Sequence, residues 1–242
     1  MAVRFCLHPG IDFGELRDRW QCEGRVAIKP FLPDAQAREL RHHLLARDDW
    51  LLWLCDHKHR HYKLSSDEIA AWGQERIAGL RSLVEPMDGT SKFGFAHHRI
   101  DIFDEHKDSF PHGLLGEFAV FLNSRETLDL VRSISGIADI DFADSFAARY
   151  DPGDFLSEHD DLRPTRKVAY VAGLTQDWDR NWGGELVFLD ADGQAAETLV
   201  PDFNTLILFN VPIQHAVVKV AATAAEPRLT VTGWFRDLKE KT

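Results

Sequence analysis

Cysteine is scarce in this 242-residue chain. The three cysteines, Cys6, Cys22 and Cys55, are an odd number at irregular spacing, and none belongs to a CxxC pair. This pattern argues against a disulfide framework and against a structural zinc site held by thiolates. Free thiols are typical of a reducing compartment, so we expect a cytoplasmic protein.

Long apolar runs are missing as well. No stretch approaches the roughly 18 consecutive apolar residues that a membrane-spanning helix needs. Residues 1–10 contain neither a long apolar segment nor a small-residue cleavage site, so we expect no secretory signal peptide. The sequence therefore predicts no contact with a membrane.

Basic residues are fewer than acidic ones. The chain has 28 Lys and Arg against 39 Asp and Glu, which gives a formal net charge of −11 and a pI near 5.5. A surface that binds a phosphate backbone is normally basic, so we expect no nucleic-acid partner. The hydrophobic fraction of 44% is enough for a packed core. Nothing in the composition specifies an oligomeric state.

The N-terminal half has a mixed pattern of helices and strands. A capping box formed by Ser65 and Glu68 predicts a helix that runs to about Val84. The other expected elements are strands at 25–31 and 93–103 and helices at 35–46, 114–122 and 124–133. We see no internal repeat and no linker, so we expect a single domain over residues 1–242, in which residues 1–141 support a C-terminal core.

Histidines alternate in one segment of this half. If His57, His59 and His61 were in a strand, their imidazoles would lie on one face and could bind a metal. The interpretation that we favour is a solvated basic loop or edge strand. The adjacent pairs at 42–43 and 97–98 point in different directions, so we give them no metal role.

The C-terminal half, residues 142–236, has a pattern of short strands. The expected strands are 142–151, 155–159, 166–174, 185–189, 197–200, 205–210, 215–220 and 228–236. They are rich in Val, Phe, Thr, Ile and Leu and are separated by Pro and Gly. This spacing predicts an α+β, mainly β fold, with a jelly-roll (double-stranded β-helix) core and supporting N-terminal helices.

Two histidines and one aspartate stand out in this core. His159 and Asp161 form a His-x-Asp unit at a strand end, and His215 begins another expected strand. Because residues i and i+2 of a strand project to the same side, His159 and Asp161 could reach one ion. Two imidazoles and one carboxylate form the facial triad of non-haem Fe(II) oxygenases. Each residue alone is more often a surface or core side chain, so the context decides.

The context consists of four further segments. They are YDPGDFLSEHDD (150–161), WGGEL (182–186), LFN (208–210) ahead of His215, and RLTVTGWF (228–235). Their order and spacing resemble the Fe(II)- and 2-oxoglutarate-dependent dioxygenases, in particular the prolyl 4-hydroxylase-like branch. The resemblance covers roughly residues 142–236 and is looser before them.

The resemblance implies roles for six residues. His159, Asp161 and His215 match the family's iron ligands. Arg228 matches the basic residue that receives the distal carboxylate of 2-oxoglutarate; Tyr150 matches a tyrosine that often helps hold it, and Thr230 would add a hydroxyl. The implied cofactor is Fe(II), with 2-oxoglutarate and O2 as cosubstrates and ascorbate as a supporting reductant. The presence of Asp161 favours hydroxylation over halogenation.

The substrate is open at this point. A prolyl residue of a protein or peptide is the leading expectation, and a free amino acid or another small metabolite is the alternative. Arg99, Asp101 and residues 57–62 are candidates for lining the entrance. A barrel that binds metal and 2-oxoglutarate without catalysis is a second alternative.

Overall fold

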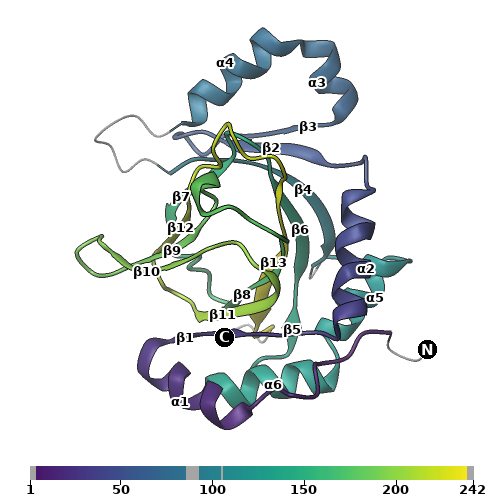
Figure 1. Ribbon diagram of the computed structural model, residues 1–242, viewed down its shortest axis with the longest axis vertical. Helices are drawn as coiled ribbons and strands as arrows, with labels where there is room; N and C mark the ends of the chain where they lie inside the picture. The colour runs from purple at the N-terminus through teal and green to yellow at the C-terminus, as the bar shows by residue number, and fades with distance from the viewer. Residues whose placement is uncertain (1–3, 86–92, 105, 239–242) are drawn as a thin grey trace.

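The computed structural model describes residues 4–85, 93–104 and 106–238, and its main feature is a mostly antiparallel sheet that curls into a barrel (Figure 1). Thirteen strands belong to this sheet, in the order β1-β11-β8-β13-β6-β4-β7-β12-β9-β10, with β2, β3 and β5 attached beside this path. The expected jelly-roll core with supporting helices is confirmed.

The C-terminal strands form most of the barrel. Their bounds are β5 Phe142–Ala143, β6 Ser145–Tyr150, β7 Phe155–His159, β8 Arg166–Leu174, β9 Leu186–Leu189, β10 Ala195–Leu199, β11 Phe203–Asn210, β12 His215–Val217 and β13 Arg228–Arg236. β8 and β13 lie in the middle of the larger face, and both are buried along most of their length. The register places Arg228 opposite Tyr150 and Thr230 opposite Ala148 and Gly173.

The N-terminal half contributes strands to the same sheet. β1 (Arg25–Ile28) pairs with β11 at one edge, and β4 (Phe95–Phe103) lies between β6 and β7. β4 also pairs with β2 (Leu51–Cys55), which pairs with β3 (His61–Leu64). This half therefore builds one wall of the barrel in addition to supporting it.

Helices cover the outside of the barrel (Figure 1). They are α1 Phe13–Glu23, α2 Asp34–Leu45, α3 Ser66–Trp72, α4 Gln74–Val84, α5 Leu114–Leu122 and α6 Arg125–Ser135, and a short 3₁₀ turn spans Arg180–Trp182. Residues of α2, α5 and α6 pack with barrel residues in one hydrophobic core. The sequence analysis missed α1, although Asp12 caps its first turn and Gly24 ends it in the left-handed conformation.

The helix expected from Ser65 to Val84 is wrong in one respect. The capping box of Ser65 and Glu68 is present, but the segment is two helices, α3 and α4, which meet at Gly73. Gly73 has a φ of 76°, which glycine adopts without the steric penalty of a side chain. The strand expected over 142–151 is also divided, into β5 and β6, at Asp144.

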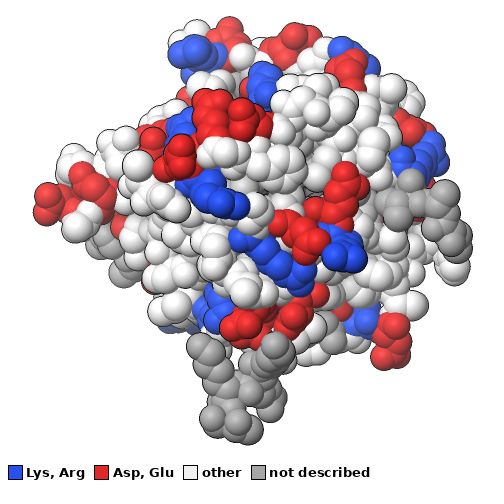
Figure 2. Space-filling view, turned by 90° about the horizontal axis from the view of Figure 1, so that it is seen from below, with Lys and Arg blue, Asp and Glu red and all other residues white. Residues whose placement is uncertain are grey.

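Two further observations concern the helices and the charge on one face. Within the described ranges, no helix is both long and apolar enough to cross a membrane. On the face seen from below in Figure 1, where α1 and α6 lie, basic and acidic residues are interspersed (Figure 2). A continuous basic surface of the kind that binds nucleic acid is not visible among the described residues of that face.

Candidate active site

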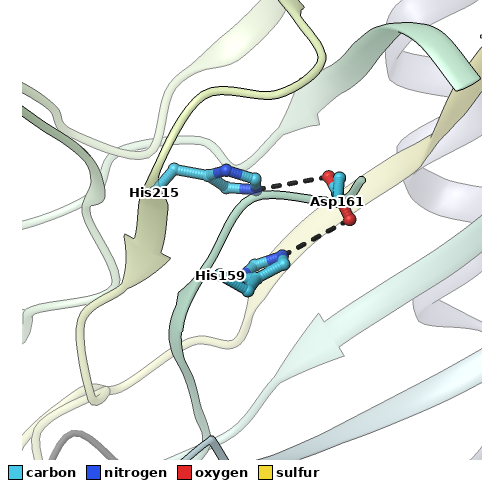
Figure 3. Close-up of side chains that lie close together, drawn as sticks. All are labelled: His159, Asp161 and His215. Carbon is cyan, nitrogen blue, oxygen red and sulfur yellow. Dashed lines mark ion pairs between the residues drawn. The ribbon is translucent and has the colours of Figure 1, made fainter. Parts of the chain in front are cut away.

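His159, Asp161 and His215 lie close together and point toward one another (Figure 3). His159 is the last residue of β7 and pairs in register with His215, the first residue of β12. The Asp161 carboxylate lies 3.5 Å from His159 Nε2 and 3.4 Å from His215 Nε2. One potential ligand atom from each residue lies within 4.8 Å of the other two. The structure therefore brings together the three residues that the sequence singled out.

Asp161 reaches this cluster in a different way from the one expected. The sequence analysis relied on the alternation of a strand, but β7 ends at His159. Asp161 lies beyond the strand in the left-handed region, with a φ of 62°. Aspartate is among the residues that tolerate this conformation best. The turn, and not the strand, aims the carboxylate at the imidazoles.

The hydrogen bonds of the two imidazoles fix which nitrogens face Asp161. His159 Nδ1 lies 2.9 Å from the Ser157 carbonyl oxygen, and His215 Nδ1 lies 2.8 Å from that of Ile213. A ring nitrogen next to a carbonyl carries the proton, so in the neutral rings both Nε2 atoms present lone pairs. Two lone pairs and a carboxylate that converge in this way require a cation between them.

The pKa of Asp161 agrees with this requirement. Burial raises the pKa of this carboxyl, but the hydrogen bonds and charge interactions with the imidazoles of His159 and His215 outweigh burial and lower the pKa well below its ordinary value. A divalent metal bound between the three groups would satisfy all of them. The donor set of two imidazole nitrogens and one carboxylate oxygen fits Fe(II) and leaves positions open for other ligands.

A second group of polar residues lies deeper in the barrel, on β6 and β13. The Arg228 guanidinium carbon lies 4.9 Å from the centroid of the Tyr150 ring, and Thr230 follows two residues later on the same face of β13. Arg228 is only 4% exposed. Its Nε has no hydrogen-bond partner, and among the described residues no carboxylate lies within ion-pair distance of it, although Glu185 attracts it from farther away. A buried cation without a close ion pair can accept an anion from the cavity.

Burial changes the ionisation of these groups. It lowers the pKa of Arg228 from its ordinary value, although the guanidinium stays charged because that value is so high. It raises the pKa of Tyr150 to about 12, so the phenol keeps its proton and can donate a hydrogen bond. Thr230 is buried too, and its hydroxyl lies 3.5 Å from the Ala148 carbonyl oxygen.

One cavity of about 290 Å³ joins both groups. Its wall contains the six residues predicted from the sequence, together with aromatic rings such as Phe93, Phe209 and Trp234 and the side chains of Arg99, Arg163 and Arg166. The ring of His215 packs edge-on against Phe209 at 4.7 Å.

The alternating histidines are divided between a turn and a strand. His57 and His59 lie in the turn between β2 and β3, and His61 begins β3. The loop or edge-strand interpretation is confirmed, and the alternative of one metal-binding face is wrong. His59 and His61 do line the cavity, as does Arg99, whereas Asp101 is outside its lining.

Sequence reasoning missed several residues of the cavity wall, and two of them have polar side chains close to the predicted site. Arg166, the first residue of β8, donates to the backbone and carboxylate oxygens of Asp161 and lies over the Trp234 ring. His97 lies in β4 between Phe95 and Arg99. Alternate positions of this strand, 95, 97 and 99, face the cavity; that spacing was the signal that could have found His97.

His98, Asp151 and Asp154 form another cluster with metal-ligand chemistry. Arg81 of α4 donates to Asp154, and the His98 Nδ1 and the Asp151 backbone nitrogen lie 3.2 and 2.9 Å from the same carboxylate. The Asp154 side chain is fully buried. A guanidinium takes the place of a metal here, so the cluster is a structural link between α4 and the barrel.

Replacing Asp154 with alanine is expected to lower the free energy of unfolding by about 3 kcal/mol, because it leaves part-buried cations without their partner. Burial raises the pKa of Asp154, but His98 and Arg81 lower it by more, so the pKa is lower in the folded protein than in the unfolded chain. The stabilisation that ionised Asp154 provides is therefore present above about pH 4 and is lost as the carboxylate is protonated. Urea unfolding measures the free energy of unfolding, and replacement of the exposed Asp108 with alanine is the control. Equal urea midpoints for Asp154→Ala and the wild type would contradict the structural role of Asp154.

Comparisons with known proteins agree with this geometry. Residues 145–236 match the model of the 2OG-Fe(II) oxygenase superfamily. Prolyl 3-hydroxylase OGFOD1 of Mus musculus is 33% identical over 108 residues, which cover 42% of this chain and 20% of that protein. The chain therefore matches only about a fifth of the length of this curated relative.

Solved structures share the fold over nearly the whole chain. A prolyl-4-hydroxylase from Pseudomonas putida has a TM-score of 0.58 at 19% identity, and the match covers 94% of this chain and 100% of that one. A prolyl hydroxylase from Trichoplax adhaerens, in complex with a hypoxia inducible factor peptide fragment, has a TM-score of 0.57 at 15% identity and covers 93% and 89%.

Residues 145–236, which contain all six predicted site residues, are therefore similar to the 2OG-Fe(II) oxygenase superfamily. The chain as a whole shares its fold with the solved prolyl hydroxylases. The name of the superfamily states its metal, Fe(II), and its cosubstrate, 2-oxoglutarate.

Proposed function

We propose that the protein is an Fe(II)- and 2-oxoglutarate-dependent dioxygenase that hydroxylates a prolyl residue of a protein or peptide. The observation that carries this proposal is that one cavity contains both a triad of metal-binding donors and a buried arginine that forms no close ion pair among the described residues. A dicarboxylate that binds a metal through one end needs the triad to hold that metal and a cation such as Arg228 to hold its other carboxylate. The relatives named prolyl hydroxylases, one of them in complex with a peptide, support the prolyl substrate.

In this proposal each residue holds a defined group. His159, Asp161 and His215 hold the iron through Nε2, a carboxylate oxygen and Nε2. When bound, iron with 2-oxoglutarate and O2 supplies the oxidative chemistry, in which 2-oxoglutarate becomes succinate and CO2 and one oxygen atom enters a substrate C–H bond. The Ser157 and Ile213 carbonyls keep the two imidazoles in the orientation that the metal needs.

Arg228, Tyr150 and Thr230 hold the distal carboxylate of 2-oxoglutarate. The planar guanidinium can pair with both oxygens of the carboxylate, and the protonated Tyr150 can donate to one of them. Gly184 keeps space beside this arginine, since a Cβ there would lie 3.3 Å from the Arg228 Cδ. These contacts fix the cosubstrate without taking part in the bond changes.

Two alternatives make different predictions. A hydroxylase of a free amino acid or other small metabolite would oxidise that molecule and leave peptides unchanged. A non-catalytic barrel would bind iron and 2-oxoglutarate and form no succinate. The complete set of metal donors together with Arg228 favours catalysis over binding alone.

The experiment that tests the proposal measures succinate. Purified protein with Fe(II), 2-oxoglutarate, O2 and ascorbate is expected to form succinate slowly without substrate and faster with a prolyl substrate. Ascorbate is included because we expect it to keep the iron ferrous. The hydroxylated product gains one oxygen atom, which mass spectrometry detects. If the iron-loaded protein forms no succinate under any of these conditions, the proposed function is wrong.

We also propose that residues 1–242 form a single domain and that the protein is cytoplasmic. The pairing of β1 and β4 with C-terminal strands supports the single domain. The three cysteines are free thiols, which supports a reducing compartment.

A further inference from the structure

His97 is buried in the wall of the cavity without a hydrogen-bond partner. It lies in β4 and is only 5% exposed. Neither its Nδ1 nor its Nε2 has a partner among the described residues. Leaving a buried polar atom unpaired is costly, and most such atoms in folded proteins are paired. An imidazole with both nitrogens free beside a ligand cavity therefore indicates a contact that a ligand completes.

The aromatic neighbours of His97 hold its ring in place. The ring stacks on Tyr150 with centroids 5.2 Å apart and an interplanar angle of 27°, and it lies 5.1 Å from Phe95. Burial lowers the pKa of His97 to about 3, so the ring is neutral at physiological pH. A neutral imidazole offers one N–H donor and one acceptor and no charge.

The arginines of the cavity wall that are not exposed are already engaged. Arg99, two residues along the strand from His97, pairs with Asp101, and Arg166 pairs with Asp161. Arg228 is assigned to the cosubstrate, and Arg163, which also lines the cavity, is exposed. A substrate with a free carboxylate would therefore find no unused buried cation at this wall, whereas a neutral carbonyl needs only the imidazole N–H.

The wall around His97 extends well beyond the metal triad. In the sheet, Trp53 of β2 lies opposite His97, and His61 of β3 lies opposite Cys55 of β2. Trp53 and His61 line the same cavity as His97. From the metal triad, this face runs over β4 and β2 to β3. It is therefore long enough to contact several residues of an extended peptide.

We propose that His97 is a substrate-binding residue that donates its N–H to a backbone carbonyl of a polypeptide beside the target residue, and that this contact makes the cavity select peptides over free amino acids. The inference rests on the proposed function and deepens it. His97 acts by binding; it takes no part in the oxidation.

The first arm of the test uses the wild-type protein with Fe(II), 2-oxoglutarate and ascorbate. One set of probes is a library of prolyl pentapeptides blocked at both ends, and the other is the free L-amino acids, L-proline included. We expect a gain of one oxygen atom in blocked peptides only. Oxidation confined to free amino acids would overturn the inference and leave the dioxygenase intact. Absence of succinate with every probe would overturn the proposed function and the inference with it.

The second arm uses variants on the best blocked peptide. His97→Phe keeps the aromatic stacking and removes the donor, and we expect kcat/KM for the peptide to fall about tenfold. His97→Asn and His97→Gln place an amide N–H near the positions of Nδ1 and Nε2, and we expect one of them to recover most of the loss. The matched control is His42→Phe on the exposed side of α2, which is expected to behave as wild type.

A second readout separates binding from a structural role. Loss of the substrate contact should raise the ratio of succinate formed to peptide hydroxylated, because the peptide is held less well while 2-oxoglutarate is consumed. Unchanged kcat/KM in His97→Phe would overturn the inference. Equal losses in the Phe, Asn and Gln variants, with the ratio of succinate to product unchanged, would also overturn it, since they would show that His97 only packs.

Discussion

Replacing His159, Asp161 or His215 with alanine is expected to abolish both iron binding and succinate formation. Each residue provides one of three donors that converge within 4.8 Å, and no fourth donor belongs to this group among the described residues. We expect the loss to exceed the roughly 10- to 100-fold that follows when only a hydrogen-bond partner of a ligand is removed. Metal titration and succinate assays measure the two effects separately.

The matched control is the neighbouring carboxylate. Asp160 lies between two of the donors, but its Oδ1 accepts a hydrogen bond from the Leu162 backbone N–H and is not part of the cluster. Asp160→Asn keeps that acceptor and is expected to retain iron and turnover within about twofold. Turnover like that of the wild type in His159→Ala or Asp161→Ala would refute the assignment of the ligands.

Replacing Arg228 with methionine is expected to have opposite effects on cosubstrate binding and on stability. Removing one partner of a buried, hydrogen-bonded charge pair costs about 2–5 kcal/mol, so the 2-oxoglutarate concentration for half-maximal rate should rise roughly thirtyfold or more. Without 2-oxoglutarate, the same change replaces a buried cation, whose charge burial disfavours and no close ion pair compensates, by an apolar chain. The free protein should therefore melt at the same or a higher temperature than the wild type.

Thermal unfolding tests both halves of this prediction. In the wild type, 2-oxoglutarate should raise the melting temperature because it binds only the folded chain. Arg228→Met should lose most of that rise, and Arg228→Lys should keep part of it, since lysine retains the charge but lacks the planar fork. Arg125, whose side chain is 93% exposed, provides the control Arg125→Met. An unchanged 2-oxoglutarate requirement in Arg228→Met would remove this residue from the site.

The barrel was predictable because its strands have strong local patterns. The strands at 155–159, 166–174 and 228–236 have the bounds that the sequence indicated. Their β-branched and aromatic residues, separated by Gly and Pro, leave little competition from helix. α1 was missed because its single buried residue, Trp20, gives no apolar stripe.

The site was predictable only in part. The metal donors are close in sequence or at strand ends, and a resemblance to a family supported them. His97 belongs to a segment far from them in sequence, and its place in the cavity depends on the pairing of β4 with β6. Such long-range pairing has no local signal. The conformation of Asp161 was not predictable either. A left-handed turn aims its carboxylate at the imidazoles, whereas we expected the alternation of a strand to do so.

The position of β4 limits how far the chain can be shortened. β4 pairs with both β6 and β7, so a fragment of residues 145–236 alone would leave the edges of these two strands without a hydrogen-bonding partner. Such a fragment should aggregate instead of folding, even though it contains every metal donor. Any shortened version of this protein must therefore include β4, or receive a substitute for it as a separate chain.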